Sequence, residues 1–290
     1  MTTAPWETPP ETRSNFLSLG AGVQSSALAL MAATGEIGPR LDAAIFADTQ
    51  SEPASVYRWL DWLEGEIARS PYPFPVHRVT RGSLKERMLD MRVTADGRVF
   101  AKTDIPFFTL AEDGSRGMVP NRACTADFKI HPIRKAVRDL AGIKRGQTEP
   151  TVTQWIGISW DEIQRCKANR DPWATNRWPL VERNLTRAQC IEWMMRRGHP
   201  SPPRSSCVFC PFHSDAEWRR LRDEEPEAFA EAVAFERNVQ QVKASTGNFR
   251  SQPFLHRSCK PLDQVDLSTA EERGQLTLGF DNECEGMCGV

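Results

Sequence analysis

The chain has 290 residues, of which 40% are hydrophobic and 26% charged, a composition typical of a globular protein with one large domain or one domain and an appendage. Its formal net charge of −1 excludes a polycation, so any nucleic-acid contact must come from a local patch. No apolar run approaches the ~20 residues that cross a bilayer, and the Thr/Pro-rich start lacks a secretory pattern, so we expect a cytoplasmic protein without a membrane partner.

Strand and helix patterns alternate along the first two thirds of the chain. Residues 1–13 are rich in Thr, Pro and Glu and are predicted to be disordered. Short apolar runs predict strands over 15–19, 43–47, 76–79 and 152–158. Helical spacing predicts helices over 25–34, 53–69, 83–91, 130–141 and 186–197. Residues 92–121 are expected to be irregular, and residues 214–243 to form a helix or a helix pair that breaks at Pro226.

This alternation predicts an α/β fold with a doubly wound parallel sheet. We place that sheet in a nucleotide-binding domain at residues 14–185. Residues 186–290 are expected to form a helical C-terminal region that carries a cysteine cluster.

A loop of small residues at 18–26 (SLGAGVQSS) separates the first predicted strand from the first helix. Small residues let a ligand approach the backbone closely, and a helix N-terminus offers N–H groups to a phosphate. Ser25 and Ser26 add hydroxyl donors at the start of that helix. The loop has neither a Walker triplet nor the glycine spacing of a dinucleotide fingerprint, and a plain strand-to-helix turn is the alternative interpretation.

Eight cysteines are unevenly placed, and without a secretory signal they favour metal ligands or reactive thiols over disulfides. Cys207 and Cys210 form a Cys-x-x-Cys pair, which brings two thiolates within reach of one metal or cluster. Cys124 lies 83 residues before Cys207, and Cys284 and Cys288 lie in the last seven residues.

A basic segment covers residues 116–145, where eight Lys or Arg stand against two Asp. Several tryptophans lie nearby in the sequence, and basic and aromatic residues together suit a nucleic-acid surface. A solvated helix face with core tryptophans is the alternative interpretation. Residues 223–236 are acidic and would repel a phosphate backbone.

Five segments occur in the order of one known family. Residues 20–25 (GAGVQS) resemble a Ser-Gly-Gly-x-Asp-Ser pyrophosphate loop, and residues 48–53 (DTQSEP) an Asp-Thr-Gly-x-Glu segment. Residues 122–132 resemble an Arg-x-Cys-Cys…Lys segment, and residues 157–165 a Gly-x-Arg-x-x-Glu-Ser-x-x-Arg segment, followed by the Trp-Pro-Leu of 178–180. Together they resemble the phosphoadenylylsulfate (PAPS) reductase branch of the adenine nucleotide alpha-hydrolase, or PP-loop ATP pyrophosphatase, superfamily.

The resemblance implies an ATP site with Mg²⁺ at the carboxyl edge of the sheet. It implies nucleotide-binding roles for Gly20, Ala21, Gly22, Gln24, Ser25, Ser26, Asp48 and Arg122, and catalytic roles for Lys129, Glu162 and Arg165. Gln24 replaces the family's Asp, which puts metal-assisted hydrolysis in question. Alternatively, Asp48 caps a turn, Lys129 and Arg165 are solvated charges, and Glu162 pairs with Arg165.

The resemblance also implies a [4Fe–4S] cluster held by Cys124, Cys207, Cys210 and a fourth ligand. Thr125 stands where the cluster-binding reductases have a second cysteine, so the fourth ligand is Cys284, Cys288 or none. The tail around Cys284 also resembles the Glu-Cys-Gly tail of those reductases, which would make Cys284 a nucleophile. Structural zinc is the alternative to the cluster.

Three functions follow from these residues. The main hypothesis is an ATP-dependent iron–sulfur enzyme that adenylates a substrate and transfers sulfur, with tRNA or DNA as acceptor and a sulfur donor such as a cysteine desulfurase. The second is a PAPS or adenylylsulfate reductase with Cys284 as nucleophile. The third is a non-enzymatic module that binds a nucleotide or nucleic acid around a structural metal.

Overall fold

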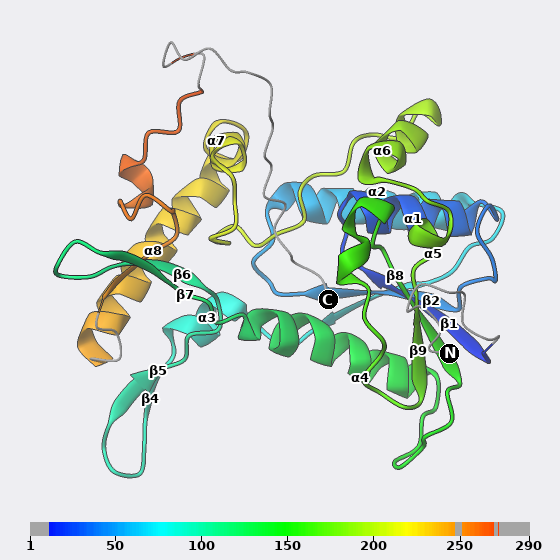
Figure 1. Cartoon of the computed structure of the whole chain (residues 1–290), viewed down its shortest axis with the longest axis horizontal. Coiled ribbons are helices and arrows are strands. Elements are labelled where there is room, and N and C mark those ends of the chain that lie inside the picture. Colours follow the sequence, from blue (N-terminus) through cyan, green and yellow to red (C-terminus); the bar gives the residue numbers. More distant parts are fainter. Residues whose placement is uncertain (1–11, 247–250, 270–271, 273–290) are drawn as a thin grey trace.

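The structure is a computed structural model that describes residues 12–246, 251–269 and 272 (Figure 1). Most of the segment 1–13 therefore lies outside the described residues, as do Cys284 and Cys288. No helix in the described part of the chain is both long enough and apolar enough to cross a membrane.

Five parallel strands form the central sheet in the order β3-β2-β1-β8-β9. Their bounds are β1 (Ser14–Leu19), β2 (Ala43–Asp48), β3 (Val76–Thr80), β8 (Val152–Ile156) and β9 (Ala174–Arg177). The strand order reverses at β1, which lies between β2 and β8. In open α/β sheets, ligands bind at the carboxyl ends of the strands beside such a reversal.

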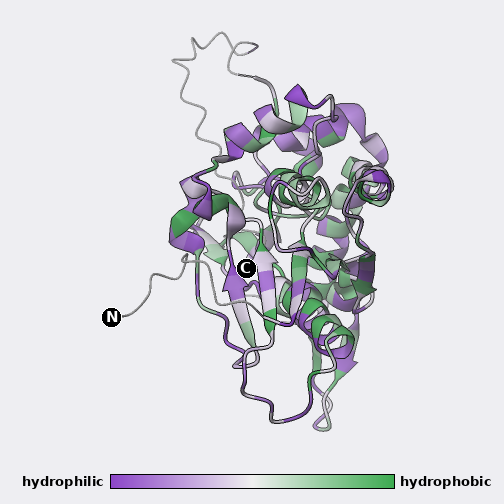
Figure 2. Cartoon of the chain, turned by 90° about the vertical axis from the view of Figure 1, so that its right-hand side faces the viewer, coloured by the Kyte–Doolittle hydropathy of each residue, from purple (hydrophilic) through white to green (hydrophobic). Residues whose placement is uncertain are grey.

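Helices cover both faces of this sheet (Figures 1 and 2). Leu17 and Leu19 point into a core shared with α1, α2 and α6, whereas Phe16 points into a core shared with α4, because side chains alternate along a strand. The helices are α1 (Val23–Ala33), α2 (Ala54–Arg69), α4 (His131–Leu140), α5 (Pro179–Glu182) and α6 (Arg187–Arg196). The α/β class is confirmed, and the flanked parallel sheet is compatible with the predicted doubly wound fold.

A second core lies beside the sheet and combines two separate stretches of chain, 84–128 and 208–267. An antiparallel sheet, β10-β6-β7, and a hairpin, β4-β5, belong to this part. Its strands are β4 (Met91–Val93), β5 (Val99–Ala101), β6 (Phe107–Leu110), β7 (Arg116–Val119) and β10 (Gln252–Phe254). Its helices are α3 (Leu84–Leu89), α7 (Asp215–Glu224) and α8 (Pro226–Thr246), with a 3-10 turn at Leu262–Gln264.

The prediction of an irregular stretch over 92–121 is wrong, because four strands lie within or beside it. Strands of three or four residues are too short to show alternation in the sequence. Gly97 and Gly114 turn the two hairpins with φ of +81° and +82°, a conformation that glycine adopts readily. The predicted break at Pro226 is confirmed, since α7 ends at Glu224 and α8 begins at Pro226.

Two further elements differ from the expected boundaries. Helix α6, expected in the C-terminal region, packs in the core of the parallel sheet through Cys190 and Met194. The packing therefore does not follow a boundary at residue 185. Helix α4 starts within the predicted range, but a π-helical segment, Thr125–Ile130, precedes it without interruption.

Glu236 joins the last described segment to α8. Its side chain is buried, with 1% of the residue exposed, and accepts hydrogen bonds from the backbone N–H groups of Leu255 and Leu262, both at 2.8 Å. Burial raises the pKa of this carboxyl. One side chain thus satisfies two buried donors that are seven residues apart in the chain.

Glu236→Ala should lower the free energy of unfolding by about 2–4 kcal/mol, because two buried N–H groups lose their acceptor. Glu231→Ala on the same helix is the control. Glu231 forms a half-exposed ion pair with Lys85, and its loss should cost under about 1 kcal/mol. Urea unfolding measures both, and equal losses would contradict this role of Glu236.

Candidate active site

The loop after β1 closes on itself through Ser25. The Ser25 hydroxyl oxygen accepts from the Gly20 N–H at 3.2 Å and lies 3.4 Å from the Gly22 carbonyl, to which it donates. Ala21 adopts a φ of +57°, in the left-handed region that favours glycine. Gly22 is the N-cap of α1 and has no side chain with which to cap it. The first N–H groups of α1 therefore face the loop as a binding position for an anion.

Ser26 was expected to add a hydroxyl donor to this loop, but its side chain points elsewhere. It is fully buried, and its hydroxyl accepts a hydrogen bond from the Trp59 indole at 3.0 Å. Ser26 therefore stabilises the packing of α1 on α2. Its position one residue further along the helix turns it away from the face where Ser25 closes the loop.

The segment after β8 lies against the same loop. A Cβ atom added at Gly157 would lie 2.8 Å from the Cα and N of Ser25, so the two backbones meet without room for a side chain. Gln24 donates from Nε2 to the Glu162 carboxylate at 3.1 Å, and Arg165 pairs with the same carboxylate. The fold thus brings Gln24, Glu162 and Arg165 together, and the Glu162–Arg165 pair matches the alternative interpretation of these charges.

Asp48 ends β2 at the same edge of the sheet. Its Oδ1 atom accepts from the Gln50 N–H at 2.7 Å and from the Tyr57 hydroxyl at 2.8 Å. Burial and the neighbouring Asp48 raise the pKa of Tyr57 above its ordinary value, so Tyr57 remains a donor. Asp48 therefore holds the turn that follows β2, as the alternative interpretation of a turn cap expects.

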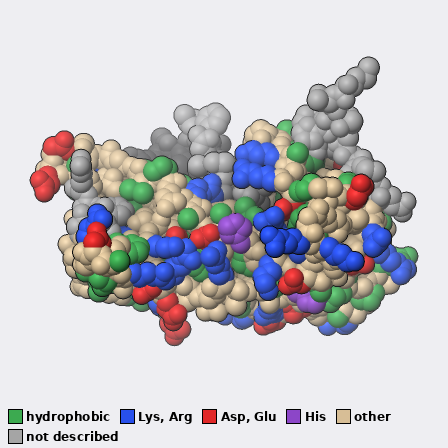
Figure 3. Space-filling view, turned by 90° about the horizontal axis from the view of Figure 1, so that it is seen from below, with side chains coloured by type: hydrophobic (Ala, Val, Ile, Leu, Met, Phe, Trp, Pro, Cys, Tyr) green, Lys and Arg blue, Asp and Glu red, His purple; other side chains and the backbone are tan. Residues whose placement is uncertain are grey.

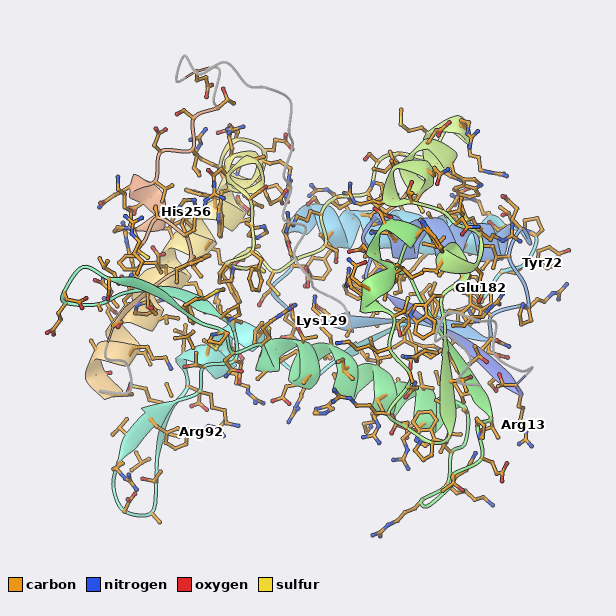
Figure 4. The ribbon with its side chains drawn as sticks, viewed as in Figure 1. Arg13, Tyr72, Arg92, Lys129, Glu182 and His256 are labelled. Carbon is orange, nitrogen blue, oxygen red and sulfur yellow. The ribbon has the colours of Figure 1, made fainter. Side chains whose placement is uncertain are left out.

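Three of the predicted cysteines line one pocket, where the second core meets the end of β2. Cys124 enters it from the stretch before α4, and Cys207 and Cys210 from the turn before α7. Arg122 and Lys129, both predicted site residues, line the same pocket. Figure 4 labels Lys129 in the middle of the molecule, between the parallel sheet and the second part.

Cys207 lies against the end of β2. Its Sγ atom is 3.3 Å from the Thr49 hydroxyl and 3.8 Å from the Glu52 carboxylate, which forms an ion pair with Lys129 at 3.8 Å. Burial, and then the Glu52 charge, raise the pKa of the Cys207 thiol, whereas Lys129 acts in the opposite direction. A bare thiolate at Cys207 is therefore unfavourable, and bound metal would compensate its charge.

The Cys207 turn is built from local hydrogen bonds. The Cys210 N–H donates to the Cys207 carbonyl at 3.0 Å, and His213 Nε2 reaches the same carbonyl at 2.9 Å. A carbonyl can only accept, so Nε2 of His213 carries the proton. Burial lowers the pKa of His213 to about 3, which keeps the ring neutral. His213 is thus a structural part of the turn.

Arg122 is held at the rim of the pocket by an aromatic ring. Its guanidinium lies 5.3 Å from the centre of the Phe212 ring. Arg204 fixes the same residue by donating to the Phe212 carbonyl at 2.8 Å. The pocket therefore has a cationic rim beside its thiols.

The loop and the cysteine turn are in direct contact. The Ser205 hydroxyl donates to the Gly20 carbonyl, and the Val208 N–H donates to the Ser51 carbonyl at 2.8 Å. These bonds hold the turn against the ends of both β1 and β2. The candidate phosphate position and the thiols are therefore two parts of one site.

The three thiols suit an iron–sulfur cluster better than a single metal ion. Within the described ranges, no group of three or more His, Cys, Asp or Glu side chains is arranged to hold a single metal ion. A [4Fe–4S] cluster is wider than one ion, and each iron takes its own thiolate. Three thiols around one pocket fit that chemistry, and Cys284 and Cys288, the predicted fourth ligands, lie outside the described residues.

Sequence analysis missed three residues that hold the site together. Thr49 and Glu52 contact Cys207. Both lie in the segment 48–53 that the family resemblance had already singled out, so the sequence could have indicated them. Ser205 contacts Gly20 from 185 residues away, and its sequence neighbourhood gives no sign of that contact.

A comparison with protein-family models finds no match for this chain, and a search of curated proteins finds none either.

Gly157→Ala should lower the free energy of unfolding by about 1–3 kcal/mol, because the added methyl group overlaps the backbone of Ser25. Gly65→Ala in α2 is the control, since its methyl group meets only the flexible end of Arg69. That change should stabilise the protein by about 0.5–1 kcal/mol. Urea unfolding gives both values, and two changes of the same sign would contradict the close approach at Gly157.

Proposed function

We propose that this chain is an ATP-dependent sulfur-transfer enzyme that carries an iron–sulfur cluster and adenylates its acceptor, of the type that thiolates nucleic acids. One observation carries the proposal: the loop after β1 and the Cys207 turn are joined by the Ser205–Gly20 hydrogen bond. Adenylation and sulfur transfer need such proximity if one bound acceptor group is to undergo both.

The nucleotide would bind where the strand order reverses. Its phosphates would lie on the loop at 20–25 and on the N–H groups at the start of α1. Arg122 and Lys129 supply positive charge from the adjoining pocket. Gln24 replaces the family's Asp and donates to Glu162, so an acidic group is retained beside the loop. Glu162 and Asp48 would supply carboxylate oxygens to a bound Mg²⁺.

The chemistry would proceed in two displacements. An acceptor oxygen attacks the α-phosphorus of ATP, the bond to the bridging oxygen breaks, and pyrophosphate leaves. Sulfur from a donor then attacks the activated carbon, and the carbon–oxygen bond breaks as AMP leaves with that oxygen. The loop N–H groups and Lys129 would stabilise the charge on the phosphate oxygens during the first displacement.

Cys124, Cys207 and Cys210 would hold the cluster, with Cys284 as the fourth ligand or with that position open. The cluster would supply an iron at which the sulfur donor is received. The position of Cys207 beside Glu52 supports this assignment, because cationic iron offsets the charge that this environment disfavours in a thiolate.

Anaerobically purified protein should contain about four irons and four acid-labile sulfides per chain if one [4Fe–4S] cluster is bound. Cys207→Ala should lose most of both, whereas Cys166→Ala, a buried cysteine outside the pocket, should keep them. Metal analysis and the absorbance spectrum give the result. Stoichiometric zinc without iron would remove sulfur transfer from the proposal.

Lys129→Ala should lower pyrophosphate release from ATP by at least about 100-fold, because the positive charge that would stabilise the phosphate oxygens is lost. The assay contains Mg²⁺ and bulk tRNA or DNA as acceptor. Lys102→Ala is the matched control, since Lys102 is exposed and lies outside the pocket.

Unchanged release by the Lys129 variant would contradict the proposal. Sulfite release from PAPS with thioredoxin and without ATP would favour the reductase instead. Nucleotide binding with no pyrophosphate release under any acceptor would favour a binding module.

A further inference from the structure

Charge is distributed unevenly along this nearly neutral chain. Residues 116–145 carry eight Lys or Arg against two Asp, a net charge of +6, so the other 260 residues together carry −7. A concentration of one sign in a tenth of the chain produces a local field that attracts polyanions.

The fold places this segment on one face of the molecule. The π-helical segment Thr125–Ile130 and α4 form one continuous helix that begins at the cysteine pocket and runs beneath the parallel sheet. Viewed from below, Lys and Arg side chains gather across this face (Figure 3). The basic surface therefore starts at the site and leads away from it.

Several cations on this face are available to a ligand. Lys135 is 82% exposed and has only a loose i,i+4 partner in Asp139, at 3.4 Å. Arg138, Lys144 and Arg145 have no ion-pair partner among the described residues. We call Lys135, Arg138, Lys144 and Arg145 the α4 surface.

Residues 223–236, from the end of α7 into α8, contain six Asp or Glu and no Lys or Arg. Four of these acids form ion pairs with Lys85, Arg220 or Arg222, and Glu236 is buried. This stretch offers no cation of its own to a polyanion, so the α4 surface is the favoured side.

We propose that the α4 surface binds the phosphate backbone of the nucleic-acid acceptor and leads it to the cysteine pocket. This inference rests on the proposed function, which assigns sulfur transfer to the cysteine pocket. From Cys124 to Arg138 the helix rises about 21 Å, at about 1.5 Å per residue. That length corresponds to about six nucleotides of a strand at about 3.4 Å each. An acceptor strand along α4 would thus contact several phosphates while its end reaches Cys124.

Fluorescence anisotropy of the full-length protein tests this surface without ATP. The probes are a fluorescein-labelled 20-nucleotide RNA and a 20-base-pair DNA duplex. Lys135→Glu/Arg138→Glu should weaken binding at least tenfold for the preferred probe. Losing two phosphate contacts should also reduce the slope of log K against log salt by about 1.4 for a single strand and about 1.8 for a duplex.

The control is Arg69→Glu/Arg196→Glu, which makes the same charge change on α2 and α6, across the sheet from α4. Both side chains are exposed, at 68% and 67%, and each has one surface partner, as Lys135 does. Binding by this variant should stay within about twofold of the wild type, after allowance for the shared change in net charge. Lys135→Arg/Arg138→Lys should also retain binding, because charge and fold are kept.

An equal loss in both charge-reversal variants, or no binding by the wild type, would overturn the inference. The result is separable from the proposed function. Selective loss in the α4 variant of a protein without iron or pyrophosphate release would keep the surface and reject the sulfur chemistry. If the protein contains iron and releases pyrophosphate, but the α4 variant binds the probes as the wild type does, the proposed function is kept and the α4 surface is rejected.

Discussion

The Ser205 hydroxyl donates a hydrogen bond to the Gly20 carbonyl, and the candidate site depends on this contact. It joins the loop after the first strand to a turn almost two hundred residues later in the chain. The Val208–Ser51 backbone bond fixes the same turn at the neighbouring strand. The carboxyl edge of the parallel sheet therefore fixes the position of the turn that carries Cys207 and Cys210. The two bonds together hold the thiols beside the position where a phosphate would bind.

Electrostatics at this edge favour a bound cation over a free thiolate. Cys207 is enclosed beside Glu52, and one ammonium group, that of Lys129, lies near that carboxylate. A metal centre and a nucleotide phosphate would bind to different groups here. The thiols and Glu52 suit a metal centre, whereas Arg122 and the loop N–H groups suit a phosphate. The pocket is thus chemically divided: it combines thiol groups beside the Glu52 carboxylate with the cationic side chains of Arg122 and Lys129.

Sequence analysis could predict the frame of the sheet, because β1 and β2 are short apolar runs, α2 has strong helical periodicity, and the loop at 18–26 has an unusual composition. The resemblance grouped Cys124, Cys207 and Cys210, and these three residues line one pocket, while their role as metal ligands stays a prediction. The strands over 91–119 were not predicted, because each is too short to show the alternation of apolar and polar residues that marks a strand. Ser26 was misassigned because periodicity does not tell which of two adjacent hydroxyls turns inward. The Ser205 contact is long-range, and only tertiary packing determines it.

The most direct test of the joined site is the labelling rate of Cys210 by N-ethylmaleimide in reduced, metal-free protein, followed by mass spectrometry. If the loop and the turn form one site, an ATP analogue with a methylene between the α- and β-phosphorus should slow labelling of this cysteine severalfold, and the matching GTP analogue should not. Ser205→Ala should weaken this protection. Identical labelling rates with and without the ATP analogue, at concentrations where it binds, would contradict the account.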